Sequence, residues 1–323
     1  MKVLITGITG MVGSHLSNYI LENHKDVEIH GLIRWRSPLD NIMPILDKIT
    51  LHQGELRDLN SLVVLLNKIK PHWIFHLAAQ SYVLTSFDIP ADTLHTNIIG
   101  TTNLLDAIRI TGLDITIHVC SSSEVYGQVT KDELPIRETN PLRPASPYAV
   151  SKVGEDMIAF QYFLSYGMKT IRTRMFTHTG PYRGDVFAES AFAKQIAEIE
   201  CGIRQNPMKV GNLDSVRTFA DVRDAVKAYW LLMEKGQPGE VYNIGGNETM
   251  TIGDMLAILK KFAHCQIDHV IDKNLIRPSD VSLQIPDISK FQQLTGWQPD
   301  IPFEQTLKDL LDYHRKRLST MRK

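Results

Sequence analysis

The chain has 323 residues, enough to bury a sizeable core, and this length favours two lobes over many small domains. Basic and acidic residues nearly balance at a net charge of -1, which argues against nucleic acid or an acidic membrane as a partner. The three cysteines have neither disulfide-framework nor metal-ligand spacing, and no apolar run approaches the roughly 20 residues of a membrane span. With a strand-like start that leaves no room for a signal peptide, we expect a cytoplasmic protein without a metal.

Short apolar runs alternate with amphipathic segments along the first half of the chain. This alternation is typical of βαβ units, whose parallel strands are covered by helices on both faces. Such crossovers are almost always right-handed, so the pattern predicts an α/β fold with a Rossmann doubly wound parallel sheet. The predicted strands span residues 3–6, 27–33, 73–77 and 115–120, and the predicted helices span residues 12–22, 61–69 and 97–110.

The second half begins with a long helix from Ser146 and Pro147 to about residue 166, because proline suits a first helical turn. A strand over residues 169–174 follows, then a helix near 188–201 and a return to the sheet near 241–244. We therefore predict a Rossmann domain over residues 1–175, with returning segments near 212–245. Residues 176–323 would mainly form a smaller C-terminal α/β lobe.

A glycine-rich loop joins the first strand to the first helix. Gly7, Gly10 and Gly13 would permit a tight turn, close approach of the backbone to a pyrophosphate, and close packing of helix on strand. Glycines also make ordinary turns, but this position between strand and helix favours a dinucleotide site. The loop residues predicted to bind the cofactor are Gly7, Thr9, Gly10, Met11, Val12 and Gly13.

The Gly-x-x-Gly-x-x-Gly spacing resembles the extended short-chain dehydrogenase/reductase superfamily. Where an acidic residue would select NAD, this chain has Arg34 and Arg36, which favour the 2'-phosphate of NADP. The alternatives are NAD as cofactor and two ordinary surface cations. The resemblance also implies cofactor contacts for Glu55 and Leu56 near the adenine, for the segment Leu77, Ala78, Ala79 and Gln80, and for Asn97.

Tyr148 and Lys152 lie four residues apart on one face of the predicted helix. A nearby ammonium stabilises a phenolate, so Lys152 would lower the pKa of Tyr148 and make it an effective base. A core tyrosine beside a solvated lysine is the alternative, but Pro147 and Ser122 complete the resemblance to the superfamily's Ser-Tyr-Lys set. We predict that all three act on a substrate hydroxyl.

The segment from Ser122 to Glu124 is similar to the strand end of sugar 4,6-dehydratases in the epimerase/dehydratase family. By this resemblance Ser123 supports the sugar and Glu124 removes the C5 proton after C4 is oxidised. Some decarboxylases and ketosugar reductases also carry an acid there, and a capping carboxylate is the plain alternative. Glu124 therefore favours a dehydratase without excluding a reductase.

Further motifs resemble GDP-mannose 4,6-dehydratases and, in the later half, GDP-4-keto-6-deoxymannose reductases. Arg217 and Arg277 lie in matching motifs, and their planar guanidinium groups suit a diphosphate. The resemblance implies that the C-terminal lobe binds a GDP-sugar. The implied substrate contacts are Ser81, Ser86, Glu124, Thr177, His178, Arg183, Phe187, Lys194, Arg217 and Arg277.

We therefore expect an NADP-dependent lyase, a GDP-sugar 4,6-dehydratase, with an NADPH-dependent ketosugar reductase or another nucleotide-sugar epimerase as the alternative. A non-enzymatic NADP-binding sensor is a third possibility that the intact Tyr148 and Lys152 disfavour. Thr177, Thr218 and Asp280 depart from the family pattern, which suggests a heptose or an amino sugar instead of mannose. The family also implies a homodimer or homotetramer.

Overall fold

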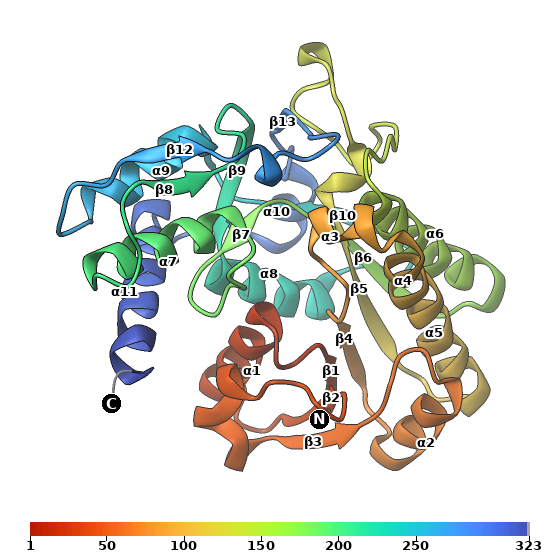
Figure 1. Cartoon of the computed structure of the whole chain (residues 1–323). Helices are drawn as coiled ribbons and strands as arrows, with labels where there is room; N and C mark the ends of the chain where they lie inside the picture. Colours follow the sequence, from red (N-terminus) through yellow and green to blue (C-terminus); the bar gives the residue numbers. More distant parts are fainter. Residues whose placement is uncertain (322–323) are drawn as a thin grey trace.

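The computed structural model describes residues 1–321, and at its centre lies a seven-stranded sheet (Figure 1). Every pairing in this sheet is parallel, and the strand order is β10-β6-β5-β4-β1-β2-β3. The predicted Rossmann sheet is therefore confirmed. The strands are β1 (Lys2–Thr6), β2 (Glu28–Ile33), β3 (Thr50–Gln53), β4 (Trp73–His76), β5 (Thr116–Ser122), β6 (Lys169–Met175) and β10 (Val241–Ile244).

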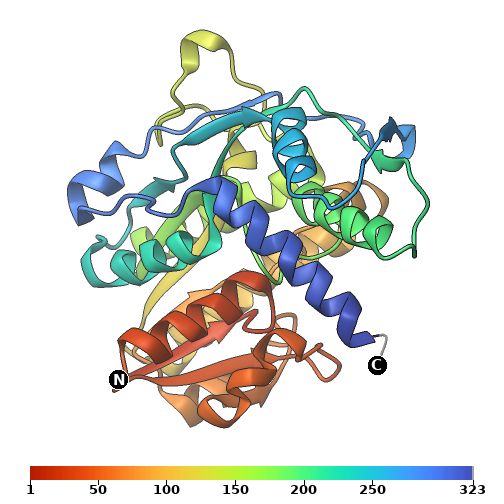
Figure 2. The same ribbon diagram turned by 90° about the vertical axis from the view of Figure 1, so that its left-hand side faces the viewer.

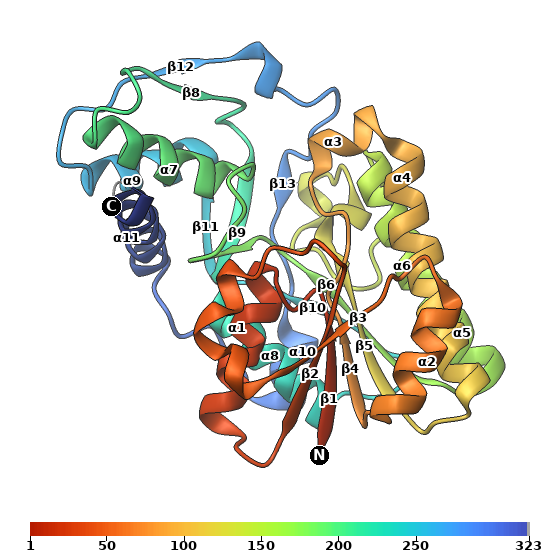
Figure 3. The same ribbon diagram turned by 60° about the horizontal axis from the view of Figure 1, so that its bottom comes forward.

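Helices cover both faces of the sheet (Figure 3). One face carries α1 (Met11–Asn23), α8 (Val222–Lys235) and α10 (Ser289–Thr295). The other carries α2 (Leu59–Ile69), α5 (Gly100–Thr111) and α6 (Pro147–Tyr166). Apolar side chains of the strands are therefore buried on both faces of the sheet.

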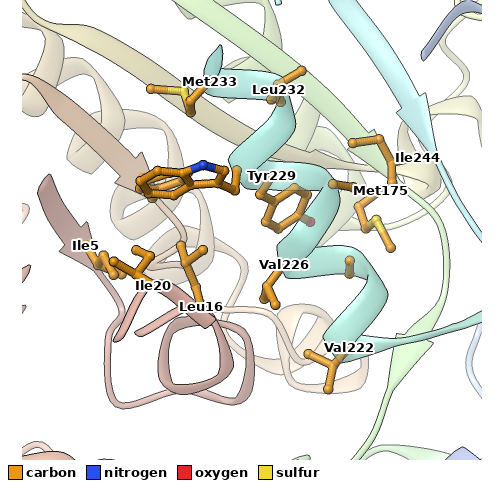
Figure 4. Close-up of a cluster of buried hydrophobic side chains, with 14 of the residues drawn as sticks. Ile5, Leu16, Ile20, Met175, Val222, Val226, Tyr229, Leu232, Met233 and Ile244 are labelled. Carbon is orange, nitrogen blue, oxygen red and sulfur yellow. The ribbon is translucent and has the colours of Figure 1, made fainter. Parts of the chain in front are cut away.

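The core on the first face is built between α1 and α8 (Figure 4). Leu16 and Ile20 from α1 and Val226 and Tyr229 from α8 are at most 1% exposed. Each such buried side chain contributes roughly 1.5–3 kcal/mol of hydrophobic free energy relative to exposure. This packing holds the N-terminus of α1 against the sheet edge where the strands end.

The C-terminal lobe is built on short strands around β9 (Val216–Asp221). β11 (Glu248–Thr251) pairs with β9 antiparallel, whereas β7 (His178–Thr179) and β13 (Leu283–Gln284) pair with it in parallel. A separate ladder joins β8 (Met208–Val210) to β12 (His269–Ile271). The helices α7 (Ala188–Glu200), α9 (Ile252–Lys261) and α11 (Phe303–Met321) enclose this lobe's own core; α11 is the long dark-blue helix in Figure 2.

Some elements differ from the sequence predictions. The predicted helix over 97–110 is preceded by α3 (Val83–Asp88), α4 (Pro90–Leu94) and a π-helical turn, η2 (His95–Ile99). The strand β3 was not predicted, because its four residues carry three polar side chains. The helix α10, which returns to the sheet late in the chain, was also not predicted. Its Phe291 packs into the core beside β10.

The remaining short turns of helix are η1 (Asp40–Lys48), η3 (Ser123–Tyr126), η4 (Lys131–Glu133) and η5 (Lys273–Leu275). The division of the chain into domains at residue 175 stays a prediction. Among residues 1–321, no helix has the length and apolar character that a bilayer span requires.

Candidate active site

The glycine loop lies at the switch point of the sheet, between β1 and β4. Gly7 has a φ of 74°, and a Cβ there would come within 2.9 Å of the Ala78 backbone after β4. A Cβ on Gly13 would lie 2.3 Å from the Gly7 carbonyl oxygen. Gly10 caps α1 without a side chain, which leaves the first backbone N–H groups of the helix directed outward. The loop therefore fits a pyrophosphate.

The loop is held by its neighbours. Asn41 on η1 donates from Nδ2 to the Thr9 carbonyl at 2.9 Å. A Cβ on Gly31 would meet the Ile8 side chain at 2.6 Å, so β2 can approach the loop only with glycine at this position. Ile8 is fully buried and anchors the loop in the core. Met11 is also buried at the start of α1, whereas Val12 is partly exposed.

A pocket of about 630 Å³ lies beside β2 and β3, with Arg34, Trp35, Arg36 and Glu55 in its lining. The Arg36 guanidinium stacks over Trp35 at 4.6 Å. Within residues 1–321 neither Arg34 nor Arg36 forms an ion pair, so both charges are available to an anion. The pocket fits the adenosine end of a phosphorylated dinucleotide. Leu56 is instead a core residue, 6% exposed, that packs on Gly100.

Asn97 organises the segment after β4. Its Oδ1 accepts a hydrogen bond from the backbone N–H of Gln80 at 2.8 Å. Its Nδ2 donates to the backbone carbonyl of Gln80 at 3.0 Å and to Ser151 Oγ at 2.8 Å. The asparagine thus ties residues 77–80 to α6 and is 1% exposed. Leu77, Ala78, Ala79 and Gln80 are all partly exposed along this segment.

Helix α6 carries Tyr148 and Lys152. Ser146 caps it by accepting a hydrogen bond from Ala149 N at 3.0 Å, and Pro147 occupies its first turn. Ser86, predicted to contact the substrate, is fully buried: its hydroxyl accepts from Tyr148 N at 3.1 Å and donates to Val83 O at 2.6 Å. This contact positions Tyr148, and the predicted substrate contact of Ser86 stays a prediction.

The ionisation of Tyr148 differs from the prediction in its net direction. Burial raises the pKa of the phenol, while Lys152 and a hydrogen bond with Ser122 lower it, and the balance leaves the pKa above its usual value. Lys152 therefore lowers the pKa of Tyr148, as predicted, but by less than burial raises it. Its Nζ donates to Cys120 O at 2.8 Å and to Glu155 Oε2 at 2.6 Å.

The acidic segment after β5 forms η3. Ser122 Oγ caps the turn by accepting from Glu124 N at 3.2 Å, and the same hydroxyl interacts with Tyr148. Ser123 is buried and Glu124 is partly exposed. Glu124 Oε1 lies 3.6 Å from Arg277 Nη1, so the predicted base and a predicted nucleotide contact come together.

Asp280 joins the two arginines. Its Oδ1 lies 3.4 Å from Arg217 Nη2 and 3.3 Å from Arg277 Nη1, and its Oδ2 accepts from Ser215 and Asn212 at 2.9 and 3.0 Å. Burial opposes ionisation of Asp280, but the arginines outweigh it and lower the pKa of the carboxyl. Asp280 is thus the group that orients both guanidinium groups.

A second group of predicted substrate residues lies on the loop before α7. Arg183 stacks on the Phe187 ring at 3.5 Å, and Phe187 meets Tyr82 edge-on at 5.8 Å. Burial lowers the pKa of Arg183, whose Nε has no hydrogen-bond partner within residues 1–321. His178 is also left with an unpartnered Nε2, and burial lowers its pKa to about 4.

The remaining predicted residues are more peripheral. Lys194 pairs with Asp185 at 2.8 Å on the Arg183 loop, and Ser81 is exposed. Thr177 accepts a backbone hydrogen bond from Ala220 N at 3.0 Å, and the Thr218 hydroxyl lies 2.7 Å from that of Thr249. None of these contacts tests the predicted substrate roles.

Sequence reasoning missed the residues that support the site. Tyr82, Glu155 and the linking role of Asp280 were not predicted as parts of the site, although Glu155 is three residues from Lys152 and thus on its face of the helix. Glu189 was also missed; it is 5% exposed and its charge acts on both Arg183 and Arg217.

Comparison with known proteins adds to this geometry. The family model described as GDP-mannose 4,6 dehydratase matches residues 4–310. The chain is 32% identical to the GDP-6-deoxy-D-mannose reductase of Pseudomonas aeruginosa over 98% of each chain. It is 34% identical to GDP-mannose 4,6 dehydratase 1 of Arabidopsis thaliana over 96% of this chain and 88% of that one. A solved structure of RMD from Pseudomonas aeruginosa complexed with NADPH superposes with a TM-score of 0.85, covers 98% of this chain and 99% of that one, and is 32% identical.

Proposed function

We propose that this chain, which belongs to the GDP-mannose 4,6 dehydratase family, removes water from a GDP-linked sugar to give the 4-keto-6-deoxy sugar. The observation that carries the proposal is the position of Glu124. The backbone N–H of Glu124 donates to the Ser122 hydroxyl at 3.2 Å, and that hydroxyl interacts with Tyr148. The residue assigned to the C5 proton is thus held next to the two residues assigned to the C4 hydroxyl.

NADP is the proposed cofactor, because Arg34 and Arg36, which form no ion pair within residues 1–321, line the pocket beside β2 and β3. The related structure from Pseudomonas aeruginosa holds NADPH, which supports the same choice. Bound at this loop, the nicotinamide would accept a hydride from C4 and return it to C6. The dinucleotide would be held by Gly7, Gly10 and Gly13, by the N-terminus of α1 and by Lys152.

The residues of this chain then divide the proton transfers between them. Tyr148 takes the proton of the C4 hydroxyl, while Ser122 donates a hydrogen bond to O4. Glu124 removes the C5 proton, which the neighbouring C4 ketone makes acidic, and gives it to the departing C6 hydroxyl as water. Tyr148 returns its proton to C5 at the end, so the residues regain their starting state.

The nucleotide end of the substrate is assigned to the C-terminal lobe. Arg217 and Arg277, held by Asp280, would bind the diphosphate in pairs of hydrogen bonds. Arg183 and His178 present buried nitrogens without hydrogen-bond partners in the described chain, and such groups favour a polar ligand. The sugar itself is proposed to be mannose, a heptose or an amino sugar.

Reduction of a 4-ketosugar with NADPH is the second candidate. It is favoured by the 98% coverage of the match to the Pseudomonas aeruginosa reductase and by the raised pKa of Tyr148, because a neutral phenol is a proton donor. One experiment separates the two. Purified protein is incubated with GDP-mannose and a trace of NADP, and the products are analysed by mass spectrometry. Loss of one water supports the dehydratase. An unchanged GDP-mannose pool, with NADPH consumed when a GDP-4-ketosugar is supplied, supports the reductase.

We also propose a homodimer formed through α6 and α5. Val150, Met157 and Leu164 recur every seven residues on α6, so they share one face, and they are 44%, 38% and 65% exposed. Ile99 at the end of η2 and Ile110 on α5 are further exposed apolar residues, at 42% and 53% exposure. Two such pairs of helices would bury each other in a four-helix contact.

A further inference from the structure

The carboxylate of Glu155 is buried directly beside the ammonium of Lys152. Glu155 is 1% exposed and Lys152 5% exposed, and their Oε2 and Nζ atoms are 2.6 Å apart. The two residues stand three positions apart on α6, so one face of the helix presents both to the end of β5. The ammonium also donates to the Cys120 carbonyl at 2.8 Å, which fixes its position between strand and helix.

This carboxylate is only half satisfied. Within residues 1–321, Glu155 Oε1 has no hydrogen-bond partner although it is buried. The adjacent Asp156 differs, since its two oxygens accept from Arg172 and Arg174 at 2.6 and 2.7 Å. Asp156 therefore joins α6 to β6, whereas Glu155 contacts the active-site lysine and leaves one oxygen free to carry a proton.

We propose that Glu155 is a positioning residue that holds Lys152 in place and, by offsetting its charge, sets how readily Tyr148 gives up its proton. The charge of Lys152 favours the Tyr148 phenolate, and the charge of Glu155 disfavours it. An ionised Glu155 thus cancels part of the electrostatic help that the lysine supplies. The inference rests on the proposed action of Tyr148 on a substrate hydroxyl.

The charge balance between Lys152 and Glu155 also depends on the titratable groups around the pair. The titratable groups facing the pair are Tyr148 and Asp156 on α6, His118 and Cys120 on β5 and His76 on β4. Tyr229 on α8 and Arg183 before α7 interact with Tyr148 itself. Burial lowers the pKa of both histidines to about 3, so they stay neutral near pH 7. Burial also raises the pKa of Cys120 and Tyr229, which keeps both protonated. Near neutral pH, Glu155 is therefore the group beside Lys152 whose charge can change.

Burial raises the pKa of Glu155 to about 7, while Lys152 acts in the opposite direction. Below that pH the carboxyl is neutral, and the full charge of Lys152 acts on Tyr148. Above it the carboxylate counteracts the lysine, and Tyr148 holds its proton more firmly. Removing the charge while keeping the side-chain shape should therefore make Tyr148 a stronger acid at every pH above about 7.

The test compares Glu155→Gln with the unchanged protein. Tyr148 is titrated through the near-ultraviolet absorption of its phenolate, as the difference between each protein and the same protein with Tyr148→Phe. We expect Tyr148 to titrate at least about one pH unit lower in Glu155→Gln, and the acidic limb of kcat/KM to move the same way. An unchanged titration would overturn the proposal.

Two further variants separate positioning from mere structure. Asp156→Asn removes the neighbouring buried carboxylate, and its Tyr148 titration should stay in place even if the protein is less stable; an equal shift would overturn the proposal. Glu155→Asp keeps the charge on a shorter side chain, so kcat should fall with the acidic limb unmoved. That variant decides the matter if Glu155→Gln does not fold, and a moved limb in it would contradict the proposal.

The titration needs neither sugar nor cofactor. If Tyr148 shifts as expected but no GDP-sugar is turned over, the proposed function fails and the role of Glu155 stands. If water is lost from a GDP-sugar and the titration does not shift, the proposed function stands and the role of Glu155 fails.

Discussion

Glu124 and Arg277 form an ion pair of 3.6 Å, although the first lies in η3 just after β5 of the Rossmann sheet and the second lies in the C-terminal lobe. Arg277 is also held by Asp280, so the contact joins the acid proposed for the C5 proton to the cluster proposed for the diphosphate. A nucleotide that draws Arg277 onto its phosphates would therefore release the Glu124 carboxylate for the sugar. Under the proposed function, binding of the nucleotide would thus free the base.

Glu124→Gln tests the proposed base. We expect the rate of water loss from the GDP-sugar to fall by roughly 10²–10⁴-fold, because an amide cannot take the C5 proton. Solvent deuterium should enter the sugar at C5 correspondingly more slowly, as followed by mass spectrometry. Glu133→Gln is the control, since that carboxylate pairs with Arg143 away from the site and should leave turnover unchanged.

Tyr148→Phe removes the hydroxyl and keeps the ring. Turnover should fall by roughly 10²–10⁴-fold, while NADPH binding measured by fluorescence stays close to that of the unchanged protein. Tyr166→Phe, at the exposed end of the same helix, should have full activity. Full turnover by Tyr148→Phe would contradict both the dehydratase and the reductase proposals.

Arg34→Ser and Arg36→Ser together test cofactor choice. Loss of two unpaired guanidinium groups should weaken NADPH binding at least about tenfold, because each charged hydrogen bond contributes roughly 1.5–3 kcal/mol. NADH, which has no 2'-phosphate, should bind equally well before and after the change. Arg57→Ser is the matched control, since Arg57 already pairs with Glu55 and Asp92. Equal loss for both nucleotides would contradict the assignment.

His118 makes stability depend on pH. Burial lowers the pKa of this histidine to about 3. Below about pH 6.5 the unfolded chain therefore binds a proton at this position that the folded chain does not bind. The free energy of unfolding should therefore fall as the pH drops from about 6.5 towards 3, by up to a few kcal/mol for this group. In urea titrations at several pH values, His118→Gln should show a shallower dependence. His264→Gln, an exposed control, should show the original slope.

Leu164→Glu tests the proposed dimer. A charge on the most exposed apolar residue of this α6 face should disrupt the contact and yield monomers in light scattering. The free energy of unfolding of the monomer should change by no more than about 0.5 kcal/mol, because the site is exposed. Val64→Glu places the same charge on a similarly exposed position of α2 and should leave the assembly intact. If Leu164→Glu and Val64→Glu have the same oligomeric state in light scattering, that result would argue against α6 as the interface.

Much of the sheet could be predicted because its signals are local. Strand and helix periods appear within windows of a few residues, and the six strands other than β3 that form the sheet fell within or close to predicted strands. The short, polar β3 and the turns α3, α4 and η2 lack such a period, and tertiary packing determines them. The return of α10 rests on Phe291 and Trp297, whose burial beside α8 no local pattern announces.

In the candidate site, too, some features follow from local sequence and others from tertiary packing. The amino-acid sequence by itself determined the glycine turn and the pairing of Tyr148 with Lys152, because a tight turn and an i, i+4 spacing need only neighbouring residues. Only the tertiary structure decided that Ser86 is buried beneath Tyr148, that Asp280 joins Arg217 to Arg277, and that Glu155 faces inward. These contacts bring together groups from different elements, and the low polarity around them gives their charges an influence that exposed charges would not have. Tyr148 is therefore identifiable from sequence, whereas its ionisation is set by the packing around it.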